Sequence, residues 1–177
     1  MATRLFTLAY PLLSAADKAM IGEFRAVHDV RNALLVEPHF TLVYGTMGVA
    51  PDDYLKHVER IAASSHSFRF HCRYAALGAN GNADTWHVYL VPDEGNSDLS
   101  RLHDRLYMGL LASHLRLDLQ YVPHMTIGTC SDAEKAKALC DEVNAGALSI
   151  AGTIGSLTVT LLVDSKIQNL QSFELAK

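Results

Sequence analysis

A five-residue pattern occurs twice in the sequence, once in each half. Its copies are Pro38-His39-Phe40-Thr41-Leu42 and Pro123-His124-Met125-Thr126-Ile127. Both read proline, histidine, apolar, threonine, apolar. From the amino-acid composition, two such copies arise by chance with a probability of about 10⁻⁵, before allowing for choosing the pattern after seeing it. The repeat is therefore the strongest signal of function in the chain.

The alternation inside the pattern predicts where its side chains point. Successive side chains on a β-strand lie on opposite faces. His39 and Thr41 therefore share one face, as do His124 and Thr126, while the apolar residues between them point into a core. If the two halves pack with pseudo-two-fold symmetry, two imidazoles and two hydroxyls converge on one cleft. The proline before each histidine lacks a backbone donor, which a strand start or an edge strand tolerates.

The order of predicted elements supports a duplicated fold. Apolar runs bounded by turn residues predict strands, and capping residues predict helices. The expected strands are 4–10, 38–44, 68–77, 85–92, 121–129, 155–163 and 168–175; the expected helices are 15–28, 51–64, 96–114 and 133–144. A turn over residues 78–82 closes the central hairpin. We expect an α+β fold that is bilobal, with pseudo-two-fold duplicated antiparallel β-sheets, outer helices and a central cleft, as a single domain over residues 1–177.

Composition limits the class of partner. The 177 residues are 49% apolar with a net charge of −4, which excludes a disordered chain. Proteins that grip long nucleic acids usually carry a basic excess, because phosphate neutralisation dominates their affinity. A small anionic ligand held by a few local donors is compatible with this charge. Three widely spaced cysteines without a Cys-x-x-Cys pair predict reduced thiols. Without a signal peptide or a membrane-spanning apolar run, we expect a cytoplasmic protein and a monomer.

Two opposed imidazoles suit concerted proton transfer. With an unperturbed pKa of about 6.5, a neutral histidine takes a proton from an attacking water while a protonated one gives a proton to the leaving oxygen. The threonine hydroxyls can donate to non-bridging oxygens, so a tetrahedral phosphodiester fits the arrangement better than a carbonyl. The nucleophile elbow, the P-loop and the dinucleotide-binding glycine motif are absent from the sequence. The other histidines show no metal-binding spacing, so we expect neither a metal nor a cofactor.

The paired motifs resemble those of the two-histidine (2H) phosphoesterase superfamily, which includes RNA 2′,3′-cyclic phosphodiesterases, also called 2′-5′ RNA ligases. The resemblance extends to the opening strand at Arg4, the hairpin before the central helix and the closing strand pair. It implies metal-independent catalysis, with His39 and His124 as base and acid and Thr41 and Thr126 as phosphate ligands. Both motifs match the family pattern in full.

Three further side chains are candidates for substrate binding. Tyr10 ends the first strand, and Tyr89 shares a face with His87 across the hairpin, so either tyrosine could stack on a base. Arg73 lies on an alternating polar face and could attract an anionic substrate. The ordinary alternative is a solvated polar face with no role in binding.

The leading hypothesis is a phosphodiesterase that hydrolyses a 2′,3′-cyclic phosphate on an RNA end or a small nucleotide to a 2′-phosphate. A 2′-5′ phosphodiester ligase or hydrolase is the alternative within the same chemistry. A non-catalytic module that binds nucleotides or RNA ends in the same cleft is the alternative from another class.

Overall fold

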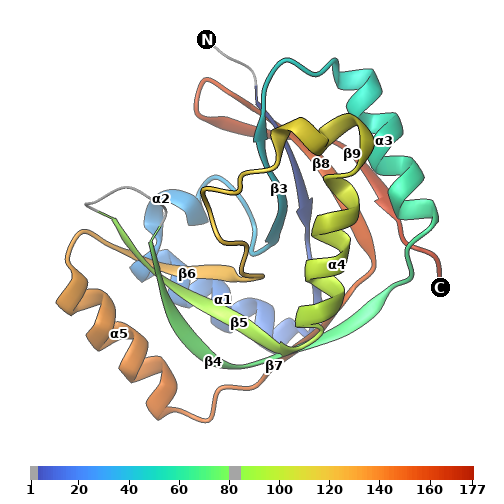
Figure 1. Cartoon of the computed structure of the whole chain (residues 1–177). Helices are drawn as coiled ribbons and strands as arrows, with labels where there is room; N and C mark the ends of the chain where they lie inside the picture. The colour runs from blue at the N-terminus through green and yellow to red at the C-terminus, as the bar shows by residue number, and fades with distance from the viewer. Residues whose placement is uncertain (1–3, 80–84) are drawn as a thin grey trace.

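Residues 4–79 and 85–177, which the structure describes, form two antiparallel sheets in a computed structural model (Figure 1). Sheet A contains, in spatial order, β3 (Phe40–Thr46), β1 (Arg4–Ala9), β8 (Ser156–Val163) and β9 (Lys166–Glu174). Sheet B contains β2 (Leu12–Leu13), β7 (Ile150–Ile154), β4 (Phe68–Ala79), β5 (Trp86–Glu94) and β6 (Met125–Cys130). Both strands that follow a motif histidine, β3 and β6, are therefore edge strands.

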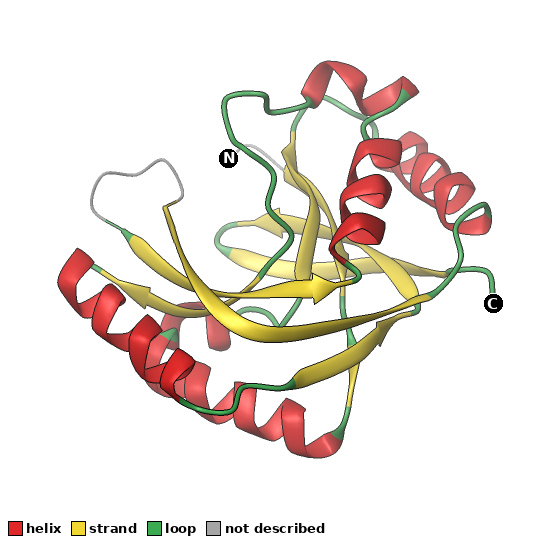
Figure 2. Ribbon diagram, turned by 60° about the horizontal axis from the view of Figure 1, so that its bottom comes forward, coloured by secondary structure: helices red, strands yellow, loops and turns green. Residues whose placement is uncertain are grey.

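Helices cover the outside of both sheets (Figure 2). The helices are α1 (Ala15–His28), α2 (Val30–Ala33), α3 (Pro51–Ala63), α4 (Asn96–Leu106), the 3-10 helix η1 (Gly109–His114) and α5 (Ala133–Ala145). Helix α3 packs on β8 and β9, and α4 lies against α3, β3 and β5. Helices α1 and α5 pack on sheet B, where an apolar cavity of about 260 Å³ lies between them.

The two sheets share one hydrophobic core. Phe40 of β3 and Phe70 of β4 meet with ring centroids 5.1 Å apart and planes at 80°, the edge-to-face arrangement that aromatic pairs prefer. Buried residues on both sides of this contact belong to a single continuous cluster. The relative placement of β3 and β6 therefore depends on core packing.

Most of the predicted elements are confirmed. Helix α1 has the predicted bounds, and the Ser14 hydroxyl accepts the amide of Asp17 at its start. The fold class is confirmed: mixed helices and antiparallel sheets with the helices outside. The three cysteines are free thiols, with Cys72 and Cys140 buried. The predicted turn falls partly on residues 80–84, which lie outside the described residues.

Several boundaries were wrong. The helix expected over 96–114 is α4 followed by η1, because Gly109, the first residue of η1, adopts a φ of 61° that an α-helix does not allow. The strand expected over 121–129 begins only at Met125. Helix α5 starts at the predicted residue, and Asp132 caps it by accepting the amides of Glu134 and Lys135. The short elements β2, α2 and β7 were not predicted.

We expect Phe70→Ala to lower the free energy of unfolding by about 3–5 kcal/mol, because it leaves a cavity at the junction of the sheets. Urea denaturation measures the change. Leu117→Ala is the control, since Leu117 is 87% exposed and its truncation should change stability by less than about 0.5 kcal/mol. Equal effects of the two substitutions would contradict the shared core.

Candidate active site

Each motif histidine lies immediately before the first residue of an edge strand. His39 precedes β3 and His124 precedes β6. The residues that follow them, Phe40 and Met125, are fully buried. Burial of these neighbours turns the histidine and threonine side chains to the other face, as the alternation predicts. Thr41 and Thr126 are partly buried and each is paired across to a central strand, with Leu8 and Tyr89 respectively.

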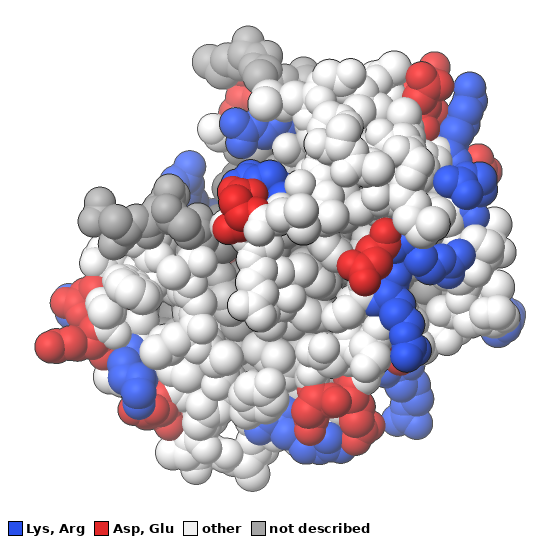
Figure 3. All heavy atoms as spheres, viewed as in Figure 1, with Lys and Arg blue, Asp and Glu red and all other residues white. Residues whose placement is uncertain are grey.

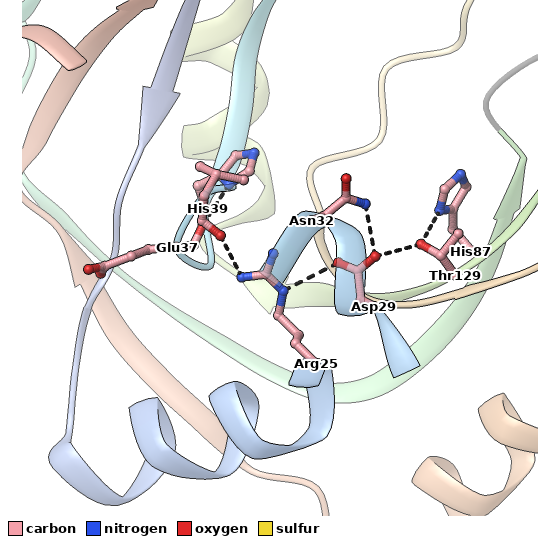
Figure 4. Close-up of polar contacts among 8 residues, drawn as sticks. Arg25, Asp29, Asn32, Glu37, His39, His87 and Thr129 are labelled. Carbon is pink, nitrogen blue, oxygen red and sulfur yellow. Dashed lines mark hydrogen bonds and ion pairs between the residues drawn. The ribbon is translucent and has the colours of Figure 1, made fainter. Parts of the chain in front are cut away.

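The two imidazoles are held by the same backbone contact. His39 Nδ1 lies 2.8 Å from the carbonyl oxygen of Glu37, and His124 Nδ1 lies 2.6 Å from that of Val122. A carbonyl oxygen only accepts, so both Nδ1 atoms carry the proton. In the neutral ring Nε2 therefore presents a lone pair, and the two motifs have matching tautomers. The His39 contact is drawn in Figure 4.

Burial lowers the pKa of both histidines. The pKa of His39 falls to about 4, chiefly through desolvation; the charges of Arg25 and His124 lower it further, while the Glu37 carbonyl and Asp29 oppose the shift. Desolvation also lowers the pKa of His124, opposed by the Val122 carbonyl. The charge of His124 lowers the pKa of His39, so protonation of His124 disfavours protonation of His39. Both are neutral near pH 7, and a bound phosphate anion would favour their charged forms.

Tyr89 packs directly on His124. The ring centroids are 3.7 Å apart with planes at 27°, and His87 lies parallel to Tyr89 at 5.7 Å. Tyr89 is only 7% exposed, so its ring is committed to these contacts rather than open to a base. A Cβ placed on Gly78 of β4 would lie 1.7 Å from Tyr89 Cε2, so the ring occupies the space that a side chain at position 78 would fill.

Tyr10 is placed beside the other histidine. Its ring meets His39 edge-on at 6.0 Å, and its hydroxyl donates to Asn169 Oδ1 at 3.2 Å. Tyr10 and Asn169 also line a cavity of about 400 Å³ with the segment before His39. The structure thus brings Tyr10, unlike Tyr89, to an open space.

Arg73 is placed differently. Its guanidinium donates to Asp93 at 2.6 Å and also to Glu94, on an exposed part of the hairpin. These carboxylates already neutralise the charge that was expected to attract substrate. On the face shown in Figure 3, most basic side chains likewise lie next to acidic ones, and uncharged surface separates these groups.

A buried ion pair next to the histidines was not predicted from the sequence. Arg25 of α1 contacts Asp29 with 3.4 Å between Nε and Oδ2, and the two residues are 4% and 3% exposed. The available signal was an arginine one turn after Ile21, on the buried stripe of an amphipathic helix. A charged residue at a core-facing position is expensive unless it is paired.

No group of three potential metal ligands within residues 4–79 and 85–177 lies close enough together to hold an ion. None of the helices described there has both the length and the apolar character needed to cross a bilayer.

Comparison with known proteins identifies the family. The sequence model of the 2′-5′ RNA ligase superfamily matches residues 11–164. The chain belongs to the 2′-5′ RNA ligase superfamily. No curated protein sequence matches it. Membership of this superfamily, which is part of the 2H phosphoesterases, together with the fold, makes the chain a phosphoesterase-type enzyme.

Solved structures with the same fold agree with this membership. The E. coli LigT complexed with 3′-AMP aligns over 100% of both chains with a TM-score of 0.60 and 17% identity. TT0787 of Thermus thermophilus aligns over 97% of both chains, with a TM-score of 0.60 and 19% identity. Kluyveromyces marxianus Usb1 aligns over 94% of this chain and 97% of its own, with a TM-score of 0.57 and 12% identity. At these identities the likeness establishes the fold.

We expect the lowered pKa of His39 to make this superfamily member acid-sensitive. Unfolded histidine takes a proton near pH 6.5, whereas folded His39 stays neutral to about pH 4. The unfolded state therefore binds more protons, and stability falls as the pH drops from about 6.5 to about 4. Urea denaturation across this pH range should show a smaller decrease in the free energy of unfolding for His39→Gln than for the wild type. His87, His103 and His124, whose pKa values are also lowered, leave a residual dependence of stability on pH. A variant slope as steep as that of the wild type would contradict this account.

We expect Gly78→Ala to displace Tyr89 from His124 and to cost about 1–3 kcal/mol of stability, because the added methyl overlaps the ring. Loss of the ring-current shift on the His124 protons, measured by NMR, reports the displacement. Gly22→Ala is the matched control: its Cβ meets nothing within 4 Å inside α1, so the change should stabilise the protein by about 0.5–1 kcal/mol. An unshifted His124 spectrum in Gly78→Ala would refute the packing role.

Proposed function

We propose that the chain is a metal-independent cyclic phosphodiesterase that converts a 2′,3′-cyclic phosphate on an RNA end or a small nucleotide to a 2′-phosphate. The observation that carries the proposal is the matched pair of Nδ1–carbonyl hydrogen bonds at His39 and His124. These bonds fix both rings in the tautomer that leaves Nε2 for the substrate. Core packing alone does not require two histidines with the same tautomer at the starts of two edge strands, whereas acid–base chemistry on one substrate does.

The pKa values support different catalytic roles for the two histidines, one as general base and the other as general acid. His39, with the pKa lowered to about 4, stays neutral and acts as the general base. His124 acts as the general acid: the anionic substrate raises its pKa, so it takes up a proton when the phosphate binds.

The reaction follows from these roles. His39 Nε2 takes a proton from water as the water oxygen forms a bond to phosphorus. The bond from phosphorus to O3′ breaks, and His124 Nε2 gives its proton to O3′. Thr41 and Thr126 donate their hydroxyl hydrogens to the non-bridging oxygens and stabilise the charge that develops there. The product is the 2′-monophosphate, and exchange with solvent restores both imidazoles.

Neighbouring residues have supporting roles in this proposal. Tyr89 orients the His124 ring by stacking on it, and Tyr10 lines the cavity beside His39 that would take the nucleoside. Arg73 is paired with two carboxylates and contributes little to anion attraction. A 2′-5′ linked dinucleotide would undergo the same chemistry, so it is the alternative substrate.

We expect His39→Ala and His124→Ala each to lower kcat on 2′,3′-cyclic nucleotides by about 10²–10⁴-fold, the usual contribution of a general acid or base. Thr41→Val and Thr126→Val should cost about 10–10³-fold. The rate is measured with and without EDTA, and EDTA should leave it unchanged. His71→Ala is the control, because that ring bonds only the exposed Ser149 hydroxyl among the described residues.

Full activity in either motif variant would overturn the mechanism, and strong inhibition by EDTA would overturn its metal-free part. A parallel assay with a 2′-5′ linked dinucleotide distinguishes the two substrate classes. Calorimetric binding of the cyclic nucleotide without any turnover would instead identify a binding module.

A further inference from the structure

A chain of polar contacts connects the segment before His39 with the strand that follows His124 (Figure 4). Its centre is the buried pair of Arg25 and Asp29, at the end of α1. Arg25 Nη1 donates to the carbonyl oxygen of Val36 at 3.0 Å. The next carbonyl along the chain, that of Glu37, accepts from His39 Nδ1. Arg25 therefore holds the stretch of backbone that orients the His39 ring.

The other half of the chain of contacts leads to β6. Asp29 Oδ1 accepts from Asn32 Nδ2 at 2.8 Å and from the Thr129 hydroxyl at 2.7 Å. Thr129 lies on β6, the strand that begins directly after His124. The Asp29 carboxylate is thus hydrogen-bonded to β6, the strand of the second motif. Its ion-pair partner Arg25 is hydrogen-bonded to the backbone just before the first motif.

Thr129 also fixes the state of a third histidine. Its hydroxyl hydrogen goes to Asp29, so its oxygen accepts from His87 Nδ1, 3.2 Å away. The His87 ring lies parallel to Tyr89, which lies on His124. Arg25 is linked to His39 through the backbone of Val36 and Glu37, and a series of side-chain contacts continues from Arg25 through Asp29, Thr129, His87 and Tyr89 to His124.

We propose that Arg25, Asp29 and Thr129 are positioning residues that set the two motif histidines relative to each other. The need for such a device follows from the topology. His39 and His124 sit at the starts of edge strands in different sheets, so no hydrogen-bonded strand pairing links β3 to β6. The shared apolar core resists separation of the sheets but is not directional, whereas charged hydrogen bonds fix distance and angle.

The charges around the histidines agree with this role. The positive charge of Arg25 lowers the pKa of His39, and the smaller effect of Asp29 raises it, so the pair adds to the desolvation that keeps His39 neutral. Asp29 also raises the pKa of His87, against the larger effect of burial. The charge of His87 in turn lowers the pKa of His124. Arg25, Asp29, His87 and the two motif histidines are thus the charged and titratable groups that act on one another's pKa along this series of contacts.

Thr129 offers the cleanest test of the proposal. Removing either charge of the ion pair leaves the other buried and unpaired, so Arg25 and Asp29 variants test folding as much as positioning. Thr129→Val removes one hydroxyl at nearly constant volume and cuts the link between Asp29 and His87. Thr129→Ser keeps the hydroxyl and is the rescue variant. Thr7→Val is the matched control, because Thr7 is a buried strand threonine whose hydroxyl bonds the Tyr54 hydroxyl at 2.9 Å on the α3 side of sheet A.

The kinetic part of the test rests on the proposed function. With a 2′,3′-cyclic nucleotide, we expect Thr129→Val to lower kcat by about tenfold with KM within about twofold, a fold-change equal to about 1.4 kcal/mol of barrier. Thr129→Ser should recover at least half of the lost rate. Thr7→Val should lose as much thermal stability as Thr129→Val while keeping kcat within about twofold. A Thr129→Val rate no lower than that of Thr7→Val would overturn the proposal.

The second part of the test needs no activity. Long-range ¹H–¹⁵N NMR spectra report the tautomer and the titration of each imidazole. We expect Thr129→Val, but not Thr7→Val or Thr129→Ser, to shift the ring signals of both His39 and His124. If the wild type hydrolyses no cyclic nucleotide while these signals still shift, the proposed function fails and the positioning role stands. Unshifted His39 and His124 signals in Thr129→Val would overturn the positioning role whatever the enzyme hydrolyses.

Discussion

Each motif histidine is oriented by the apolar residues that alternate with it. Phe40 and Met125 are completely buried, and the same strands cannot turn those side chains outward without opening the core. The orientation of His39 and His124 thus follows from the burial of apolar side chains, which is the largest favourable contribution to folding. Their hydrogen bonds to backbone carbonyls then set only the rotation of each ring. Burial of the neighbouring residues sets the direction of each histidine side chain, and the carbonyl hydrogen bond sets the rotation of its ring. Two short motifs that are far apart in sequence therefore hold their imidazoles in the same tautomer.

The location that orients the imidazoles also removes them from water. Desolvation is the first cause of the lowered pKa at both His39 and His124, and the charges of Arg25 and His124 add to it at His39. A site that disfavours imidazolium when empty favours it once an anion enters, because the anion supplies the missing counter-charge. In the proposed mechanism, binding of a phosphodiester and protonation of His124 would therefore be coupled. The site needs no surplus of basic side chains, which fits the net charge of −4.

The sequence predicted what depends on local pattern and missed what depends on distant contacts. Helix α1 was placed correctly because its Ser14 cap lies beside it in the chain. The break at Gly109 was missed because apolar residues continue at helical spacing on both sides of it. The pairing of Arg25 with Asp29 could have been predicted, because the two residues are one helical turn apart. The hydrogen bond between Thr129 and Asp29 could not, because it joins residues a hundred positions apart. Tyr89 was assigned to base stacking because nothing in the sequence shows that His124 covers its ring.

The pseudo-two-fold arrangement is broken where the chemistry requires a difference. The two histidines share a tautomer and a strand position, yet their surroundings differ: an arginine acts on His39, whereas Tyr89 and a neutral His87 stack behind His124. A cation beside one imidazole opposes its protonation more strongly than an aromatic ring does at the other. Identical surroundings would make the proton equally stable on either ring, so neither would be poised as base or acid. The asymmetry comes from residues outside the repeated motif, and in the proposed mechanism it is what separates the base from the acid.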